Sequence, residues 1–238
     1  MGFEPIIITG GTENYAGSLN VLLSSITHTN PEAVCNAYCF GWRDSLVQEF
    51  EGKHEVNFNR VEISEELGES VKNNVRSGEA LKMKISSILD SAVHKGNHGG
   101  VLWIDADSVV TGDISKILLK LKSDSVDVMC TRRKHRSEPH LNFALGVIGI
   151  SNSLLGNRFI FDLNESMKTS LGVDGWFHDQ LEFYNSFSRI MPRIHSFTKE
   201  EHTLKGYTNS LIYSRRESIE STPGDIAEYL GIPIKEIG

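Results

Sequence analysis

The sequence predicts an α/β fold in which helices flank a mostly parallel central sheet, built as a single domain over residues 1–238. Strand-like runs alternate with helix-like runs along the chain, which is typical of strands joined by crossover helices. The run Val101–Ile104 is continuously apolar and lies between glycine and aspartate, as expected of a central strand buried on both faces. No internal repeat and no linker divides the chain, so one domain is the simpler interpretation.

Short apolar, β-branched runs mark the expected strands. They cover residues 5–9, 34–40, 56–63, 101–104, 126–130 and 144–150. Gly10 and Gly11 follow the first of these runs, and we expect them to form the tight turn that ends it.

Apolar residues at helical spacing predict the helices. They cover residues 16–27, 78–94, 114–121 and 153–170. The most regular of them, 78–94, places Ile85, Ile88 and Leu89 on one face. We therefore expect these three side chains to be buried where the helix packs on the sheet.

The composition is that of a soluble globular protein, with 39% hydrophobic and 23% charged residues. A net charge of −7 argues against nucleic acid as a partner, because nucleic-acid binding is driven by basic surfaces. Residues 222–233 have the N-cap, first-turn proline and closing glycine of one capped helix and leave no room for a recognition helix. No apolar stretch approaches the roughly 20 residues that a membrane span needs.

The three cysteines give no sign of a disulfide framework or a zinc site. Cys35 and Cys39 lie an even number of residues apart in one expected strand, and Cys130 is distant from both. The N-terminus also lacks the basic region of a signal peptide. We therefore expect buried, reduced thiols in a cytoplasmic protein.

Asp105-Ala106-Asp107 is the strongest functional signal, because it follows directly on the expected central strand. Side chains two residues apart on a strand point to the same side, so both carboxylates should converge at its carboxyl end. Ligands bind at that end of the strands in open α/β sheets. Two carboxylates repel each other unless a cation or a proton lies between them, and Mn²⁺ and Mg²⁺ prefer oxygen ligands. The pattern therefore indicates a metal site, and the alternative is a pair of solvated turn residues.

Residues 101–110, Val-Leu-Trp-Ile-Asp-Ala-Asp-Ser-Val-Val, resemble the DxD segment of the GT-A glycosyltransferases. Further segments resemble that family in the same order: the helical run Lys-Ile-Ser-Ser-Ile-Leu that begins at Lys84, the segment from Asn142 to Ile150 with Asn142 and Gly146 near the expected places, and the pair Asp179-Gln180, which is similar to the D-Q motif. The resemblance implies a Rossmann-like GT-A nucleotide-diphospho-sugar transferase fold. It also implies transfer of a sugar from a nucleotide-diphosphate donor, with a UDP-sugar favoured, to a glycan, lipid-linked or protein acceptor.

The same resemblance implies roles for single residues. Asp105 and Asp107 are expected to bind Mn²⁺ or Mg²⁺. Asp179 and Gln180 are expected to be catalytic, with Asp179 a base in an inverting reaction or a sugar-binding residue in a retaining one, and the alternative is a helix N-cap. Donor-binding residues are expected at Thr9, Gly10, Gly11, Tyr15, Lys84, Asp105, Asn142 and Gly146. Tyr15 could stack on the base, and the glycines let the backbone approach a ligand.

GT-A enzymes commonly take a third metal ligand, usually His, from near the C-terminus. His202, which Lys205 and Gly206 follow closely, is the expected ligand in this chain. His195 is an alternative, and another alignment places Tyr213 at that position.

Two other functions fit parts of the pattern. A nucleotidyltransferase shares the core fold and the metal dependence, but it normally has a basic residue in the first glycine-rich loop, and residues 10–17 contain neither Arg nor Lys. A non-catalytic nucleotide-sugar-binding protein would bind the donor without transferring or hydrolysing it. The basic residues within 132–136 could hold an acceptor or neutralise the leaving diphosphate, or they form a solvated surface loop.

Overall fold

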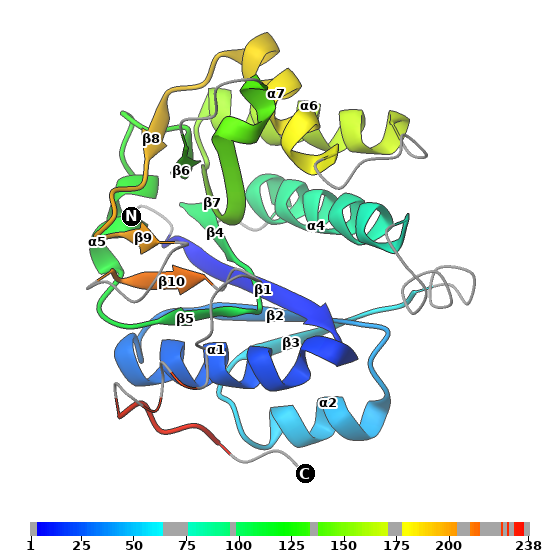
Figure 1. The fold of residues 1–238 in the computed structure, drawn as a ribbon, viewed down its shortest axis with the longest axis vertical. Coiled ribbons are helices and arrows are strands. Elements are labelled where there is room, and N and C mark those ends of the chain that lie inside the picture. Colours follow the sequence, from blue (N-terminus) through cyan, green and yellow to red (C-terminus); the bar gives the residue numbers. More distant parts are fainter. Residues whose placement is uncertain are drawn as a thin grey trace. The chain divides into compact units, whose positions relative to one another are not determined.

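The computed structural model describes residues 4–63, 76–95, 99–133, 138–170, 178–203, 210–214, 225, 228 and 231–235 (Figure 1). Of residues 76–84, 95 and 203 it describes the backbone alone. Most of the helix expected within 222–233 lies outside the described residues, and so do Lys134, His135 and Arg136 of the basic run.

The main sheet has seven strands in the order β3-β2-β1-β4-β7-β6-β8. They are β1 (Ile6–Thr12), β2 (Cys35–Phe40), β3 (Asn57–Val61), β4 (Gly100–Ile104), β6 (Val128–Arg132), β7 (Phe143–Ser151) and β8 (Ile194–Ser196). The pairs β1–β2, β2–β3 and β6–β8 are parallel, whereas β6–β7 is antiparallel. A second sheet has the order β5-β10-β9, with β5 (Ser108–Val110), β9 (His202–Thr203) and β10 (Ile212–Ser214). The predicted α/β fold with a mostly parallel sheet is therefore confirmed.

The described part of the chain has six α-helices, and four of them, α1, α4, α5 and α6, agree with the predicted ones within two residues at each end. They are α1 (Ala16–Thr29), α2 (Asp44–Glu51), α4 (Arg76–Lys95), α5 (Ser115–Leu121), α6 (Leu154–Thr169) and α7 (His178–Ile190), with short 3₁₀ turns η1 (Glu13–Tyr15) and η2 (Pro139–Asn142). Two of them, α2 and α7, were not predicted as helices. In α2 the buried residues Leu46, Val47 and Phe50 have helical spacing, so the pattern was present in the sequence. No helix within the described ranges combines the length and the apolar composition of a membrane span.

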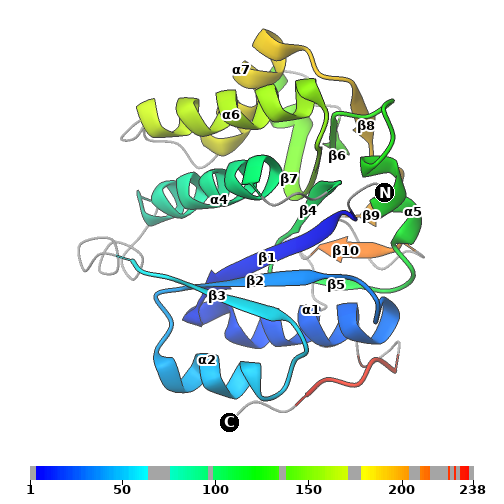
Figure 2. The same cartoon turned by 180° about the vertical axis from the view of Figure 1, so that it is seen from behind.

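The chain separates into two compact units. The β1 unit comprises Ile6–Glu62, Trp103–Leu119 and Phe197–Gly238, and the α6 unit comprises Met1–Pro5, Ile63–Leu102 and Lys120–Ser196. That these units form one domain stays a prediction. In the β1 unit, α1 and α2 lie on the same side of β1, β2 and β3 (Figures 1 and 2).

The glycines at positions 10 and 11 belong to β1, and the prediction that they form a turn is wrong. Strand β1 continues through Thr12, and Gly10 lies opposite Tyr38 of β2. A Cβ atom at Gly10 would lie 2.4 Å from the carbonyl oxygen of Tyr38 and 3.0 Å from the ring of Phe40. Gly10 is therefore required by close packing between the strands, since only glycine lacks the clashing atom.

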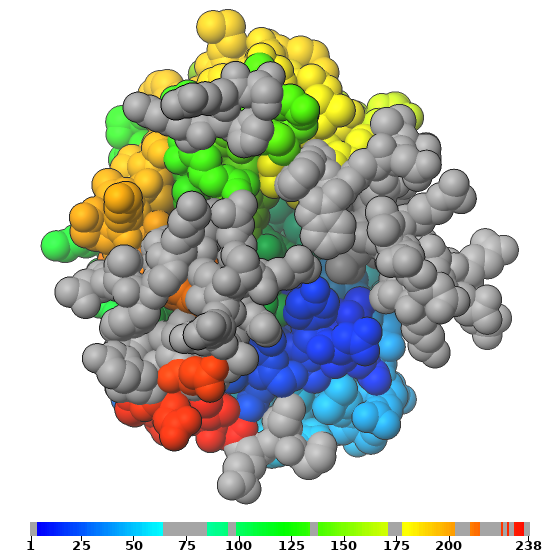
Figure 3. All heavy atoms as spheres, viewed as in Figure 1, coloured from blue at the N-terminus to red at the C-terminus, as the bar shows by residue number. Residues whose placement is uncertain are grey.

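A segment from near the C-terminus docks on α1. Ile232 is 5% exposed, and the Asn20 side-chain amide donates to the carbonyl oxygen of Lys235 over 2.5 Å. Nε2 of His54 lies 2.7 Å from Oδ1 of the same asparagine, and because that oxygen is an acceptor, the imidazole donates. Burial lowers the pKa of His54 to about 4, so this imidazole is neutral at pH 7. In Figure 3 the C-terminal residues (red) lie at the surface beside residues from the start of the chain (blue).

In the α6 unit, α4 packs on α6 through a face that differs from the predicted one. Ser86, Leu89 and Val93 are buried, whereas Ile85 and Ile88 are only half-buried. The prediction that these two isoleucines belong to the core is therefore wrong, and the prediction for Leu89 is confirmed.

A buried asparagine explains the orientation of α4. Asn164 of α6 is 3% exposed, and its Oδ1 accepts hydrogen bonds from the hydroxyls of Ser86 and Ser87 at 3.3 and 2.7 Å. Its Nδ2 donates to Asp90 over 3.0 Å. Because a buried amide must be hydrogen-bonded, the polar edge of α4 turns toward α6, and Ile85 and Ile88 turn partly outward.

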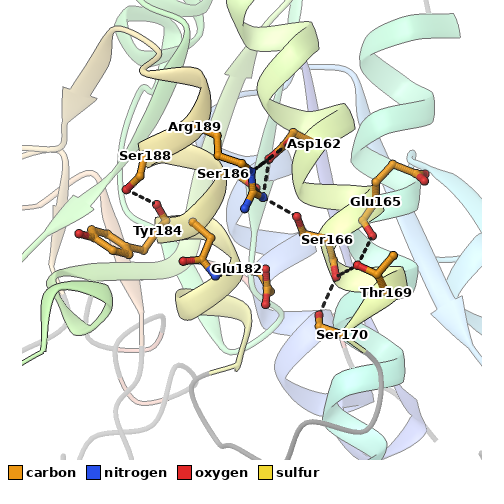
Figure 4. Close-up of polar contacts among 11 residues, drawn as sticks. Asp162, Glu165, Ser166, Thr169, Ser170, Glu182, Tyr184, Ser186, Ser188 and Arg189 are labelled. Carbon is orange, nitrogen blue, oxygen red and sulfur yellow. Dashed lines mark hydrogen bonds and ion pairs between the residues drawn. The ribbon is translucent and has the colours of Figure 1, made fainter.

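Helices α6 and α7 are joined by a surface ion pair (Figure 4). The guanidinium of Arg189 donates to Asp162 through Nε and Nη2 at 3.0 and 2.7 Å, and Nη2 also reaches the hydroxyl of Ser166 at 2.5 Å. Both charged side chains are partly exposed, so we expect the pair to contribute little stability.

A second ion pair in the same unit is buried on its acidic side. Asp127 is fully buried and accepts hydrogen bonds from the backbone N–H and the guanidinium of Arg193 and from the hydroxyl of Ser153, the N-cap of α6. The hydrogen bonds from Arg193 lower the pKa of Asp127 from 3.8 to about 2. One carboxylate thus ties the start of β6, the entry to β8 and the start of α6 together.

We predict that Asp127→Asn lowers the free energy of unfolding by about 2–3 kcal/mol at pH 7, the value that a shift of this size implies. The folded pKa is lower than the unfolded one, so this stabilisation is present above pH 4 and is lost as the pH falls from about 4 to 2. Urea denaturation at several pH values measures it. Asp162→Asn removes the half-exposed partner of Arg189 and should cost under about 1 kcal/mol. An equal decrease in the free energy of unfolding for the two variants would show that burial of Asp127 does not strengthen its ion pair.

Candidate functional site

The carboxylates of the DxD segment lie in a turn. Strand β4 is buried throughout and ends at Ile104, and the N–H of Ser108 donates to the carbonyl oxygen of Asp105 over 3.0 Å, which closes a four-residue turn. Asp105 and Asp107 are half-buried, and Ala106 between them is 5% exposed. The pair directly follows the strand, as predicted, but it lies in the turn that leads to β5 and not in extended backbone. The alternation of strand side chains does not apply to these two carboxylates.

The indole of Trp103 fixes the first carboxylate. Its Nε1–H donates to Oδ1 of Asp105 over 2.6 Å, and the Trp103 side chain is 2% exposed. A hydrogen bond to a charged acceptor is stronger than one between neutral groups. This contact was not predicted from the sequence, although Trp103 and Asp105 are only two residues apart.

The end of β1 lies beside this turn. A Cβ atom at Gly11 would lie 3.0 Å from Cβ of Tyr15 and 3.5 Å from Cβ of Ala106. At Gly11 the strand β1 therefore lies close to both η1 and the DxD turn. The Trp42 indole donates to the carbonyl oxygen of Gly11 over 2.8 Å and holds this backbone in place. Tyr15 is 48% exposed. The structure thus brings Gly11, Tyr15 and the DxD turn together, and their role in donor binding stays a prediction.

Thr9 is enclosed in the same strand. Its side chain is fully buried, and Oγ1 finds no hydrogen-bond partner among the residues that the structure describes. Thr9 has no exposed surface in this structure. Its assignment as a donor-binding residue stays a prediction.

The expected third metal ligand is buried and hydrogen-bonded. Nε2 of His202 lies 2.9 Å from Oγ of Ser214, and burial lowers the pKa of His202 to about 4. In the described part of the chain, no three His, Cys, Asp or Glu side chains are grouped closely enough to hold a metal. The structure therefore does not bring His202 together with the two aspartates, and its role as a ligand stays a prediction.

The two alternative ligands lie in other surroundings. Nζ of Lys120 lies 3.2 Å from Nε2 of His195, and a lysine ammonium can only donate, so that nitrogen of His195 is the acceptor. Tyr213 is fully buried in a cluster with Val21, Val109 and Ile232.

Asp179 and Gln180 lie in the first turn of α7, in the α6 unit. Both are half-buried, and Oε1 of Gln180 is a buried acceptor with no donor within the described ranges. Nε2 of the preceding residue, His178, lies 2.9 Å from Oγ of Ser170, the C-cap of α6. The start of α7 is thus tied to the end of α6, while Trp176 and Phe177 before it lie outside the described residues.

The remaining predicted donor residues belong to the same unit. Asn142 ends η2, and its carbonyl oxygen accepts from the N–H of Arg133 over 2.7 Å. Gly146 lies where the β6–β7 register jumps from Cys130–Ile148 to Thr131–Ala144, so it belongs to a bulge. The backbone of Lys84 lies in α4, and its side chain is outside the described part of the structure.

We predict that Trp103→Phe lowers the free energy of unfolding by about 1.5–3 kcal/mol, the value of a hydrogen bond to a charged group. Trp42→Phe is the matched control, because its indole donates to a neutral carbonyl and should cost about 0.5–1.5 kcal/mol. Chemical denaturation at pH 7 measures both. A loss for Trp103→Phe no larger than that for Trp42→Phe would show that the indole does not hold a charged Asp105.

No protein-family model matches the sequence, and no curated protein matches it significantly. Solved structures do match the fold. The galactosyltransferase LgtC, solved in complex with donor and acceptor sugar analogues, is 13% identical and superposes with a TM-score of 0.64 over 94% of this chain and 95% of its own. The apo form of the glycosyltransferase GlyE of Streptococcus pneumoniae TIGR4 is 12% identical, with a TM-score of 0.63 over 97% of this chain.

The bifunctional glycosyltransferase WbbM is likewise 12% identical, with a TM-score of 0.61 over 97% of this chain. The chain spans 60% of the apo GlyE chain and 50% of WbbM. At these identities the likeness concerns the fold. The predicted resemblance to the GT-A glycosyltransferases is therefore confirmed at the level of the fold.

Proposed function

We propose that this protein transfers a sugar from a nucleotide-diphosphate donor, a UDP-sugar being favoured, and that Asp105 and Asp107 bind the divalent ion that the transfer requires. The observation that carries the proposal is the DxD turn, which follows a buried central strand in a GT-A fold and has its first carboxylate oriented by Trp103. Three of the solved structures that match the fold are described as glycosyltransferases, which supports the same activity.

The side chains of the turn fit Mn²⁺ or Mg²⁺. Carboxylate oxygens are the ligands that these hard ions prefer, and a half-buried position lets an ion keep some of its water. When bound, the ion supplies Lewis-acid stabilisation of the departing diphosphate. The Trp103 indole orients Asp105 before any ion binds, so little reorganisation is required.

The end of β1 provides the surface for the nucleoside. Gly11 has no side chain, so the backbone there is open to close approach, and the exposed ring of Tyr15 next to it can stack on a base. In this proposal Asp179 deprotonates the acceptor hydroxyl or stabilises positive charge on the sugar, and Gln180 binds the sugar. These two roles rest on the similarity of the sequence to the D-Q motif.

We predict that Asp107→Asn abolishes the Mn²⁺-dependent binding of UDP or a UDP-sugar, because it removes one of the two anionic ligands. Thermal-shift and calorimetric titrations with and without Mn²⁺ measure this binding, since only a ligand of the folded state stabilises it. Asp113→Asn is the control: its carboxylate is exposed in the same unit and accepts hydrogen bonds from Ser115. Unchanged Mn²⁺-dependent binding by Asp107→Asn would remove the metal site from the proposal.

We predict that Asp179→Asn lowers the turnover of sugar transfer by about 10²- to 10⁴-fold, the usual contribution of a general base. Donor affinity should stay nearly unchanged, because the nucleotide and the metal are bound by other residues. Glu165→Gln, an exposed change on α6, is the control. Transfer by Asp179→Asn at the wild-type rate would contradict the catalytic role. In the turnover assay, release of UDP from a UDP-sugar identifies a glycosyltransferase, whereas release of pyrophosphate from a nucleoside triphosphate and a sugar phosphate would identify a nucleotidyltransferase.

A further inference from the structure

A buried chain of three polar side chains connects the DxD turn to the small sheet of the β1 unit. Oγ of Ser108, the residue after Asp107, lies 2.7 Å from Oγ of Ser214, which in turn lies 2.9 Å from Nε2 of His202. Ser108 is fully buried, and the other two side chains are 2% exposed. The three residues come from β5, β10 and β9, the three strands of this sheet.

Nε2 of His202 is engaged in this chain whichever tautomer is present. If the nitrogen is bare, its lone pair accepts the proton of Ser214, and if it carries a hydrogen, it donates to the oxygen of Ser214 and has no lone pair for an ion. An ion at Nε2 would therefore have to displace Ser214. In this arrangement His202 orients the Ser214 hydroxyl and does not offer Nε2 to a metal.

Ser108 carries the effect of the chain into the turn. Its backbone N–H closes the turn by donating to the carbonyl oxygen of Asp105, while its hydroxyl is held by Ser214. The register of β5 and β10 pairs Ser108 directly with Ser214 and places the fully buried Tyr213 opposite Val109. The end of the turn is thus fixed by a backbone bond on one side and by a side-chain bond on the other.

We propose that Ser214 and His202 are positioning residues that act through Ser108 to set the orientation of the Asp105–Asp107 turn, an inference that rests on the proposed function for its catalytic meaning. A fully satisfied polar chain specifies one arrangement of the strands that meet at it, which apolar side chains of the same size do not do. Ser214 bonds to Ser108, the last residue of the turn, and Trp103 bonds to Asp105, its first residue. Together they hold both ends of the segment that carries the two carboxylates.

The test combines two readouts on Ser214→Ala, His202→Ala and the double variant. The first is the indole N–H signal of Trp103 in a ¹H–¹⁵N spectrum without metal, assigned with Trp103→Phe, because this proton bonds to Asp105 and reports the geometry of the turn. The second is the affinity for Mn²⁺ in the presence of UDP, measured from the free-ion electron paramagnetic resonance signal. Ser210→Ala is the matched control, since the hydroxyl of Ser210 is equally buried and has no partner among the described residues.

We expect each single variant to shift the Trp103 signal and to weaken Mn²⁺ binding by about 3- to 10-fold, as the loss of one hydrogen bond implies. The double variant should bind no more weakly than either single one, because both break the same chain. Ser210→Ala should change neither readout. Ser214→Thr, which keeps the hydroxyl, should restore the wild-type values, and Ser214→Cys provides a milder break if Ser214→Ala does not fold.

Three outcomes would overturn the inference. Loss of Mn²⁺ binding in His202→Ala with wild-type binding in Ser214→Ala would make His202 a metal ligand. An unchanged Trp103 signal in both single variants would show that the Ser108–Ser214–His202 hydrogen bonds do not set the turn. Equal effects of Ser210→Ala would show that the changes in the Trp103 signal and in Mn²⁺ affinity are not specific to these hydrogen bonds. Failure of the wild type to bind Mn²⁺ with UDP would contradict the proposed function instead, and the Trp103 signal would still decide whether the chain sets the turn.

Discussion

The chain leaves the buried strand β4 at Asp105 and must reverse within four residues to reach β5, and the hydrogen bond from Ser108 N–H to the Asp105 carbonyl oxygen makes this reversal possible. The turn brings the two carboxylates out of the strand, where they are half-buried. Ala106 between them stays buried and leaves room for Gly11 at close range. The positions of both aspartates therefore follow from where β4 ends.

Two carboxylates in this protein show how their surroundings separate a structural role from a functional one. Asp127 is fully buried, and a guanidinium donates to it, so its pKa falls to about 2 and its charge is neutralised inside the protein. The indole that donates to Asp105 orients that carboxylate and adds no positive charge. A fully buried charge must be paired inside the protein, whereas a hydrogen bond from a neutral indole leaves the negative charge of the carboxylate in place.

The sequence predicted strands β1 to β4, β6 and β7 and helices α1, α4, α5 and α6 in their order, because hydrophobic periodicity and glycine punctuation are local signals. The short strands β5, β8, β9 and β10 and the helices α2 and α7 were not predicted. It failed where a contact with a distant residue decided the outcome. Gly10 looked like a turn residue, but the carbonyl of Tyr38 leaves no room for a Cβ there. Ile88 looked like a core residue, but Asn164 on another helix draws a different edge of α4 inward. The pairing of Ser108 with Ser214 joins residues 106 positions apart, and no local pattern could predict it.

Two protein carboxylates are sufficient for the ion that the proposed reaction needs. Mg²⁺ keeps several waters in most sites and is bound through one or two carboxylates together with the phosphates of the substrate. The affinity for the ion then depends on the nucleotide that shares it, so the site has to be tested with UDP present. Because two ligands restrain an ion less than a full protein cage, their relative orientation has to come from the backbone. The bonds made by Trp103 and Ser108 lie at the two ends of the turn, where such a restraint would act. In our proposal His202 therefore affects the ion through Ser214 and Ser108 and not by contact.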